Sequence, residues 1–90
     1  MRIEQSGIFR RRVKKLYVDE KKALDGAVRA VLDDPEIGDL KIGDLAGVRV
    51  YKYKHKVQQY LLAYQVKDEG LILALIALGT HENFYLDLKK

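Results

Sequence analysis

The side chains best suited to acid-base chemistry follow directly on the most apolar stretch of the chain. Residues Leu71–Leu78 are all apolar and lie between Gly70 and Gly79. This run is too short to cross a bilayer and predicts a strand buried on both faces. The next residues carry a hydroxyl, an imidazole, a carboxylate, an amide and two aromatic rings: Thr80, His81, Glu82, Asn83, Phe84 and Tyr85. A histidine changes charge close to neutral pH, so the imidazole of His81 suits proton transfer at the edge where this core strand ends.

Basic side chains are concentrated in two short segments. The first contains Arg10, Arg11, Arg12, Lys14 and Lys15, and the second contains Arg49, Lys52, Lys54 and Lys56. Between them lies an acidic segment with Asp33, Asp34, Glu36, Asp39 and Asp44. The chain has 17 Lys and Arg against 13 Asp and Glu, a net charge of +4 and a pI near 9.3. A polarised basic surface of this kind favours a polyanionic partner such as nucleic acid.

Composition also excludes several kinds of chemistry. The chain has no cysteine and two histidines, His55 and His81, so it has no disulfide framework, no thiolate nucleophile and no clustered zinc-ligand spacing. We therefore expect no metal and no cofactor. Because no apolar N-terminal segment precedes a cleavage site, we expect a cytoplasmic protein without membrane association.

Two helical patterns precede the strands. After Ser6, a suitable cap, Phe9, Val13 and Leu16 recur at i, i+4 and i+7, and basic residues occupy the other faces. A second helix is predicted from about Asp19 to Asp33, with an inward stripe of Leu24, Ala27, Val28 and Val31. Pro35 ends it. Gly26 lies inside this helix at a cost of roughly 1 kcal/mol relative to alanine, and we expect it to allow a close helix contact.

Three strand-like runs follow at hairpin spacing: Val48–Lys54, Val57–Val66 and Leu71–Leu78. They predict an antiparallel meander with the third strand inside. A weak N-terminal strand at Arg2–Glu4 would make four strands if it paired with the third. Ile37–Gly47, which repeats Ile-Gly-Asp-Leu, predicts a bent connection.

These elements predict a single α+β domain over residues 1–90. Its sheet has about four antiparallel strands, and the N-terminal helical hairpin packs on one face of that sheet. In the first meander strand, alternation puts Lys52 and Lys54 on one face and Arg49, Tyr51 and Tyr53 on the other. The tail Asn83–Lys90 is expected to add one or two helical turns.

Four segments together resemble the RelE/ParE superfamily of bacterial type II toxin-antitoxin toxins, with the RelE-like branch favoured. They are FRRRVKKL at Phe9–Leu16, IGDLAGVRVYKY at Ile42–Tyr53, LLAYQV at Leu61–Val66 and ALGTHENFYLDLKK at Ala77–Lys90. The resemblance covers nearly the whole chain. It implies a microbial ribonuclease-like sheet and, for the RelE branch, metal-independent cleavage of messenger RNA in the ribosomal A site, which inhibits translation. The implied partners are a small antitoxin, the ribosome and its messenger, with DNA contacted only through the antitoxin.

The resemblance also implies roles for individual residues. His81 would act as base or acid, and Tyr85 would stack on a nucleobase or orient the scissile phosphate. Lys52, Lys54 and Arg49 would stabilise the charge that develops on the phosphate. Contacts with RNA or the ribosome would come from the basic first helix, through Arg10, Arg11, Arg12, Lys14 and Lys15.

Other functions remain open from the sequence. The middle strand has Gln58, Gln59 and Tyr60 where RelE carries an arginine, and Glu82 beside His81 is compatible with the ParE branch, whose members inhibit DNA gyrase. A noncatalytic basic nucleic-acid-binding domain is a further alternative. Lysines on an exposed strand also discourage edge pairing, and a basic helix face is often simply solvated.

Overall fold

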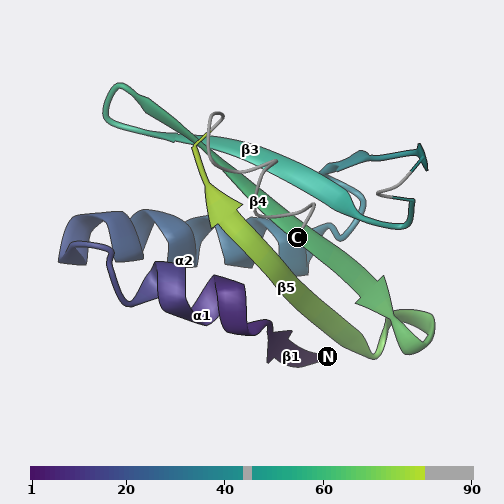
Figure 1. Cartoon of the computed structure of the whole chain (residues 1–90). Helices are drawn as coiled ribbons and strands as arrows, with labels where there is room; N and C mark the ends of the chain where they lie inside the picture. Colours follow the sequence, from purple (N-terminus) through teal and green to yellow (C-terminus); the bar gives the residue numbers. More distant parts are fainter. Residues whose placement is uncertain (44–45, 81–90) are drawn as a thin grey trace.

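A computed structural model describes residues 1–43 and 46–80, which form a five-stranded sheet and two helices (Figure 1). The elements are β1 (Arg2–Gln5), α1 (Gly7–Val13), α2 (Val18–Asp33), β2 (Asp39–Leu40), β3 (Arg49–His55), β4 (Gln58–Lys67), a 3₁₀ turn at Asp68–Gly70 and β5 (Ile72–Gly79). The strand order across the sheet is β1-β5-β4-β3-β2. Among the described helices, none is long and apolar enough to span a membrane.

The predicted α+β class is confirmed, but the strand count and the direction of one strand were wrong. β1 does pair with β5, yet the pair is parallel, with Arg2 opposite Ile72 and Gln5 opposite Leu75. A fifth strand, β2, pairs antiparallel with β3 inside the segment expected to be only a bent connection. It is two residues long, too short for a period-two pattern to reveal it, and nothing in the short β1 segment encodes its direction.

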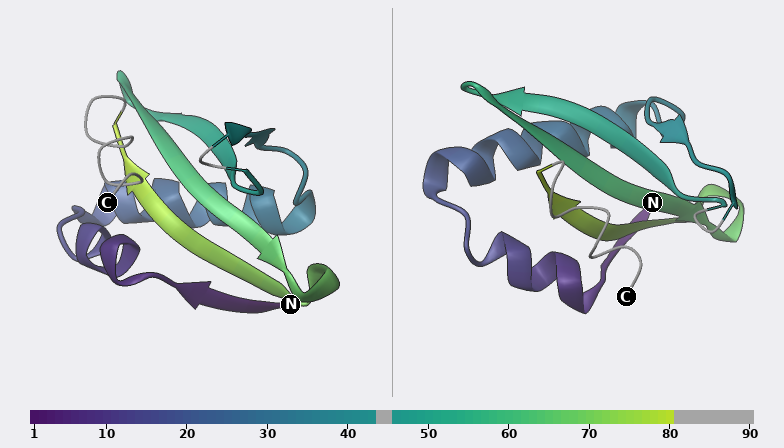
Figure 2. Two further views of the ribbon diagram at one scale, coloured as in Figure 1. Left: turned by 45° about the vertical axis from the view of Figure 1, so that its right-hand side comes forward. Right: turned by 45° about the horizontal axis from the view of Figure 1, so that its top comes forward.

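Both helices lie on the same side of the sheet (Figure 2), as the helical hairpin predicted. Four helical side chains, Phe9, Leu24, Ala27 and Val31, meet Leu62, Tyr64, Leu73, Leu75 and Leu78 of the two central strands. On the opposite face Val50, Leu61, Ala63 and Ala77 form a second buried cluster. β5 therefore contributes buried residues to both faces, as its uninterrupted apolar run predicted.

Ser6 fixes the start of α1 against β5. Its hydroxyl accepts a hydrogen bond from the backbone N–H of Phe9 at 3.0 Å and donates one to the carbonyl of Ile76. Its own N–H donates to the carbonyl of Leu75 at 3.0 Å. The predicted cap is confirmed, and it also ties the helix to the strand that ends near the candidate site.

The connection between α2 and β2 is held by the fully buried Tyr64. Its hydroxyl donates to the carbonyl of Pro35 at 2.7 Å and accepts from the N–H of Gly38 at 2.9 Å. A Cβ atom at Gly38 would lie 2.8 Å from that hydroxyl and 3.0 Å from the backbone carbon of Val50. By contrast, a Cβ at Gly26 would meet nothing within 4 Å among the described residues, so the close helix contact expected there is absent.

Replacing each of these two glycines with alanine should change the stability of the protein in opposite directions. Gly38→Ala should destabilise the protein by about 1–3 kcal/mol, because the buried tyrosine and the backbone of β3 leave no room for a methyl group. Gly26→Ala should stabilise it by roughly 0.5–1 kcal/mol through helix propensity alone. Urea unfolding of both variants measures the two changes. A Gly38→Ala protein as stable as the wild type would contradict the packing described around Tyr64.

Candidate functional site

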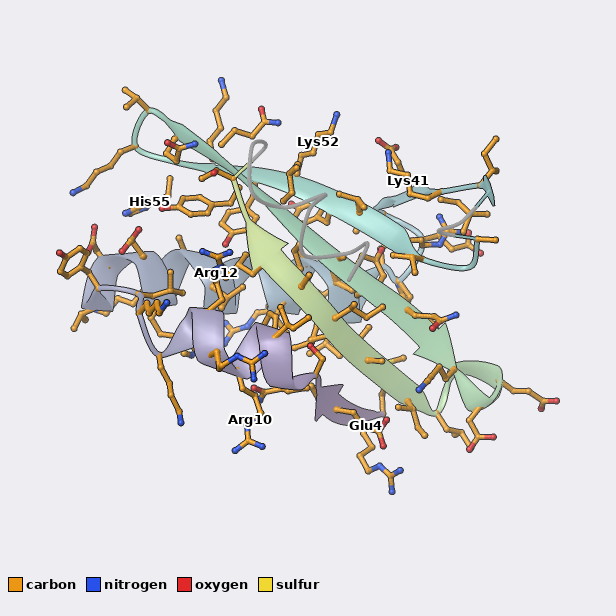
Figure 3. The ribbon with its side chains drawn as sticks, in the orientation of Figure 1. Glu4, Arg10, Arg12, Lys41, Lys52 and His55 are labelled. Atoms are coloured by element: carbon orange, nitrogen blue, oxygen red, sulfur yellow. The ribbon has the colours of Figure 1, made fainter. Side chains whose placement is uncertain are left out.

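Lys52 and Lys54 stand on the face of β3 that points away from the helices. Lys52 is opposite Leu61 and Lys54 is opposite Gln59 on β4, and both lysines and Gln59 are exposed. Figure 3 shows Lys52 projecting from the side of the sheet opposite α1. Beside them, the same face carries the buried cluster around Val50. The structure therefore places two cations and one amide together over an apolar floor.

The end of β5 lies in the same row of the sheet. Gly79 is opposite Leu61, which in turn is opposite Lys52. With strands about 4.8 Å apart, the Cα atoms of Gly79 and Lys52 are separated by roughly 10 Å. His81 and Tyr85, the predicted acid-base and stacking residues, lie outside the described residues, as does the tail predicted to be helical.

Arg49 lies apart from these two lysines. It belongs to the opposite face of β3, and its guanidinium donates to the backbone carbonyls of Glu36 at 3.3 Å and Gly38 at 2.9 Å. These bonds brace the connection that Tyr64 also holds. The alternation of β3 already separated Arg49 from the lysines, and the structure adds the carbonyl partners, which no local pattern could have supplied.

The basic segment that begins in α1 has side chains exposed to solvent and side chains that line a pocket. Arg10, Arg11, Lys14 and Lys15 are exposed, whereas Arg12 is half-buried. Arg12 and Lys15 line a pocket of about 280 Å³ whose wall includes Gly79 and Thr80. Part of the predicted RNA-binding segment thus borders the exit of β5. Cations in the last turn also interact favourably with the helix dipole, so their position has a structural explanation as well.

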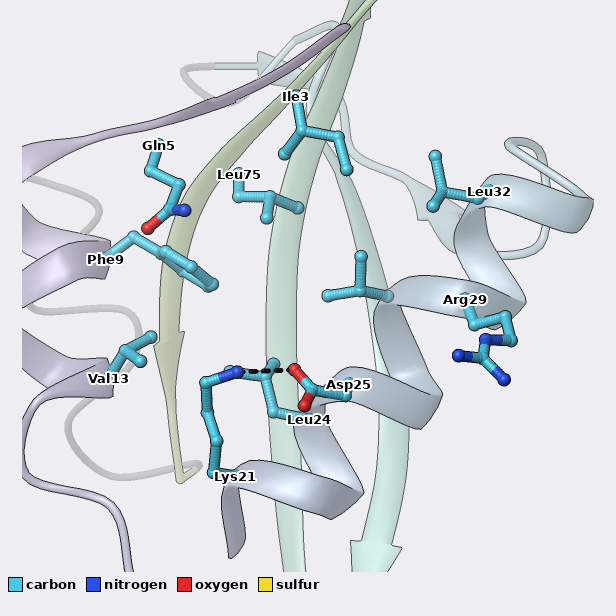
Figure 4. A pocket seen from close by; sticks show the side chains of 11 residues that line it. Ile3, Gln5, Phe9, Val13, Lys21, Leu24, Asp25, Arg29, Leu32 and Leu75 are labelled. Carbon is cyan, nitrogen blue, oxygen red and sulfur yellow. Dashed lines mark hydrogen bonds and ion pairs between the residues drawn. The ribbon is translucent and has the colours of Figure 1, made fainter. Parts of the chain in front are cut away.

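A separate pocket of about 260 Å³ lies between the two helices and β1 (Figure 4). Its floor includes Phe9, Leu24 and Leu75, and its rim carries an ion pair in which Lys21 Nζ and Asp25 Oδ1 are 2.6 Å apart. Because it opens on the helix side, it is separated by the sheet from Lys52 and Lys54.

A cluster that the sequence did not reveal joins the first turn of α2 to the β3–β4 hairpin. The Asp19 carboxylate is 2.8 Å from His55 Nε2 and 3.3 Å from Lys56 Nζ. The Tyr60 hydroxyl donates to Glu20 Oε2 at 2.5 Å. Because these partners are 36 to 40 residues apart in the sequence, no spacing rule connects them. His55 is the last residue of β3 and has a partner on α2.

These contacts shift the pKa values of Asp19, Glu20 and Tyr60. The hydrogen bond with His55, followed by that with Lys56, lowers the pKa of Asp19 from 3.8 to about 2. The hydrogen bond from Tyr60, followed by that from the N–H of Tyr17, lowers the pKa of Glu20 below its usual 4.5. The same bond to Glu20, aided by partial burial, raises the pKa of Tyr60 to about 12. At neutral pH the carboxylates of Asp19 and Glu20 are therefore ionised, and the phenol of Tyr60 is protonated.

The lowered pKa values predict how stability depends on acid. An acid whose folded-state pKa lies below its unfolded value stabilises the fold above the unfolded value, and this contribution is lost as the pH falls through the folded value. The double variant Asp19→Asn, Glu20→Gln should therefore be less stable than the wild type at pH 7, with the difference shrinking as the pH falls below 4.5 towards pH 2. Urea unfolding midpoints from pH 7 to pH 2 measure this. Asp25→Asn, which affects an ion pair within α2, is the control, and a pH-independent difference in the double variant would contradict the assignment.

The described residues contain no group of three or more histidine and acidic side chains that could hold a metal ion. The groups that the described face offers for chemistry are the cations Lys52 and Lys54 and the amide of Gln59, close to the end of β5.

Comparison with known families finds one match along almost the entire chain. The model of the ParE-like toxin of type II bacterial toxin-antitoxin systems matches residues 3–89. No curated protein matches the sequence.

Several solved structures share the fold. The isolated RelE toxin of E. coli is 26% identical, with a TM-score of 0.69 over 90% of this chain and 84% of that chain. A chain of the intact E. coli RelBE toxin-antitoxin complex is 23% identical, with a TM-score of 0.72 over 90% of this chain and 96% of that one. The YoeB/ParE toxin from Agrobacterium tumefaciens is 16% identical, with a TM-score of 0.71 over 90% and 99% of the two chains.

Proposed function

The chain belongs to the family of ParE-like toxins of type II bacterial toxin-antitoxin systems, and we propose that its toxic activity is ribosome-dependent cleavage of messenger RNA. The observation that carries this proposal is the row of the sheet in which Lys52, Leu61 and Gly79 lie side by side. The exposed Lys52 and Lys54 lie on β3 near the end of β5. In the sequence, a histidine follows two residues after that end. The structural similarity to the isolated E. coli RelE toxin supports the same proposed activity.

The proposed reaction is attack of a ribose 2′-hydroxyl on the adjacent phosphate. A base removes the proton of the 2′-hydroxyl, and the 2′ oxygen bonds to phosphorus while the bond from phosphorus to the 5′ oxygen breaks. An acid gives a proton to that leaving oxygen. The products are a 2′,3′-cyclic phosphate and a 5′-hydroxyl. His81 serves as base or acid, because histidine is the side chain that ordinarily changes charge close to neutral pH.

The lysines stabilise charge, and Tyr85 orients the substrate. As the 2′ oxygen attacks, negative charge builds up on the nonbridging phosphate oxygens, and Lys52 and Lys54 are poised to neutralise it. Gln59, opposite Lys54, offers an amide donor on the middle strand. Tyr85 stacks on a base or orients the phosphate. Arg49 lies on the other face of β3, where its Nη1 donates to the carbonyls of Glu36 and Gly38, and we assign it no contact with the phosphate.

The proposed partners follow from this activity. A small antitoxin binds the toxin, as RelB binds RelE in the E. coli complex. The ribosome and its messenger are the targets, which places the activity in the cytoplasm. The exposed cations Arg10 and Arg11 of α1, and Lys14 and Lys15 just after it, are available for phosphates of ribosomal RNA. Such contacts would make ribosome affinity fall steeply with salt, because each neutralised phosphate releases counterions.

Expression of the chain in cells tests the proposal. Primer extension on a translated messenger should show new 5′ ends inside codons, and pulse labelling should show an immediate fall in protein synthesis. The new 5′ ends should disappear when the start codon of the reporter is removed, because an untranslated messenger does not enter the ribosome, whereas the fall in total protein synthesis should remain. An intact messenger during growth arrest would contradict the proposal.

Inhibition of DNA gyrase is a second candidate for the same fold. It is favoured by the matching family, which is described as ParE-like, and by the absence of an arginine near Gln59. A gyrase inhibitor would need no acid-base set. It would induce a DNA-damage response and inhibit supercoiling by purified gyrase, while messenger and translation stayed intact.

A further inference from the structure

The far end of the β3–β4 hairpin extends beyond the rest of the sheet. The last described row with three strands is Lys52, Leu61 and Gly79. Beyond it, β3 and β4 have only each other among the described strands, and Figure 1 shows the hairpin passing the tip of β5. Lys54, opposite Gln59, is in this two-stranded part. A two-stranded ribbon by itself is at best marginally stable in water, so Lys54 needs support from elsewhere.

That support comes from the first turn of α2. We define the hairpin contact as Asp19 and Glu20 of α2 with His55 and Tyr60 of the hairpin. Its two bonds are His55 Nε2 to Asp19 Oδ2 at 2.8 Å and Tyr60 hydroxyl to Glu20 Oε2 at 2.5 Å. Glu20 is itself held, because its Oε1 accepts from the N–H of Tyr17 at 2.9 Å.

Aromatic stacking extends the hairpin contact along β3. The rings of Tyr53 and Tyr60 are stacked with centroids 5.5 Å apart. Lys54 is therefore flanked by two residues, Tyr53 and His55, that are both held on the helix side of the strand. Because strand residues alternate between faces, holding these two neighbours fixes the direction in which the Lys54 side chain leaves the opposite face.

We propose that Asp19 and Glu20 are positioning residues for Lys54: by binding His55 and Tyr60 they hold the two-stranded end of the hairpin so that Lys54 meets the scissile phosphate. This inference rests on the proposed ribonuclease function. It makes the N-terminus of α2, on the other side of the sheet from the lysines, part of the catalytic apparatus without contact to RNA. A reacting group displaced by about 1 Å can lose roughly 100-fold in rate.

Two tyrosines on the same face provide the test. Tyr60→Phe keeps the stacked ring and removes the hydroxyl that binds Glu20. Tyr53→Phe is the matched control, because among the described residues the Tyr53 hydroxyl has no hydrogen-bond partner. Asp19→Asn and Asp25→Asn form a second pair, since among the described residues Asp25 bonds only to Lys21, within α2.

Two readouts separate positioning from general stability. Hydrogen exchange should become roughly tenfold faster at the amides of residues 54–59 in Tyr60→Phe and Asp19→Asn, with the amides of β5 unchanged. The cleavage rate at saturating ribosomes should fall roughly tenfold or more, while cosedimentation with ribosomes stays as in the wild type. Tyr53→Phe and Asp25→Asn should behave as the wild type in both.

The outcomes are distinguishable. Equal exchange in Tyr60→Phe and Tyr53→Phe would overturn the hairpin contact as the support of Lys54. Faster exchange without slower cleavage would overturn the positioning role. A wild-type protein that cleaves no messenger would overturn the proposed function and with it the catalytic part of the inference, whereas the exchange comparison would still decide whether the contact holds the hairpin.

Discussion

A protein in which Lys52 and Lys54 are both alanine should still bind ribosomes, but it should cleave messenger at least about 1,000-fold more slowly than the wild type. The loss of one preorganised donor to a developing oxyanion typically costs roughly 100- to 1,000-fold in rate, and both lysines face the same open side of β3. Because both side chains are exposed, stability should change by no more than about 0.5 kcal/mol. Single-turnover cleavage on programmed ribosomes, with urea unfolding of the same protein, measures both quantities.

The matched control for this variant is Lys21→Ala with Lys22→Ala. It removes the same net charge from exposed positions on α2, away from the face of Lys52. Cleavage by the control should stay within a few-fold of the wild type. Equal losses in the two double variants would mean that net charge, rather than the site on β3, drives the activity.

Replacing His81 with alanine should reduce cleavage by about 10² to 10⁴-fold, the usual contribution of a positioned acid or base. The wild-type rate should also depend on pH near the ordinary pKa of histidine, about 6.5, and the remaining activity of His81→Ala should lose that dependence. Rate against pH for both proteins, measured in single turnovers, tests this. Full cleavage activity in His81→Ala at every pH would remove the residue from the reaction.

Patterns of hydrophobicity were sufficient to predict the central strands and the helices. The apolar run that ends at Leu78 predicted a strand buried on both faces, and alternation in β3 assigned Lys52 and Lys54 to one face. Ser6 was recognisable as a helix cap because capping is a local interaction. These features depend on residues within a few positions of one another, which is the range over which a sequence pattern carries information.

Features set by distant partners were not predictable. The parallel direction of β1 and the two-residue β2 depend on which strands lie beside them. The carbonyl partners of Arg49 and the bond between Glu20 and Tyr60 connect segments separated by many residues. Open space beside Gly26 likewise depends on what packs around α2. In each case the tertiary arrangement decided the outcome, and the local residue types were compatible with more than one result.

The sequence thus predicted which face of β3 carries Lys52 and Lys54, but it did not predict the contacts that hold this strand in place. Sequence reasoning named the two lysines and grouped Arg49 with them as phosphate-binding cations. In the structure Lys52 and Lys54 are exposed, whereas Arg49 donates hydrogen bonds to backbone carbonyls in the connection to β2. It also reveals that the hairpin carrying Lys54 is tied to the start of α2.

The most direct test is incubation of the purified wild-type chain with a labelled messenger, either free or bound to programmed ribosomes, followed by analysis of the RNA ends. We expect cleavage only of the ribosome-bound messenger, with 2′,3′-cyclic phosphate and 5′-hydroxyl ends. An intact messenger on the ribosome, together with inhibition of gyrase supercoiling by the same preparation, would contradict the ribonuclease account.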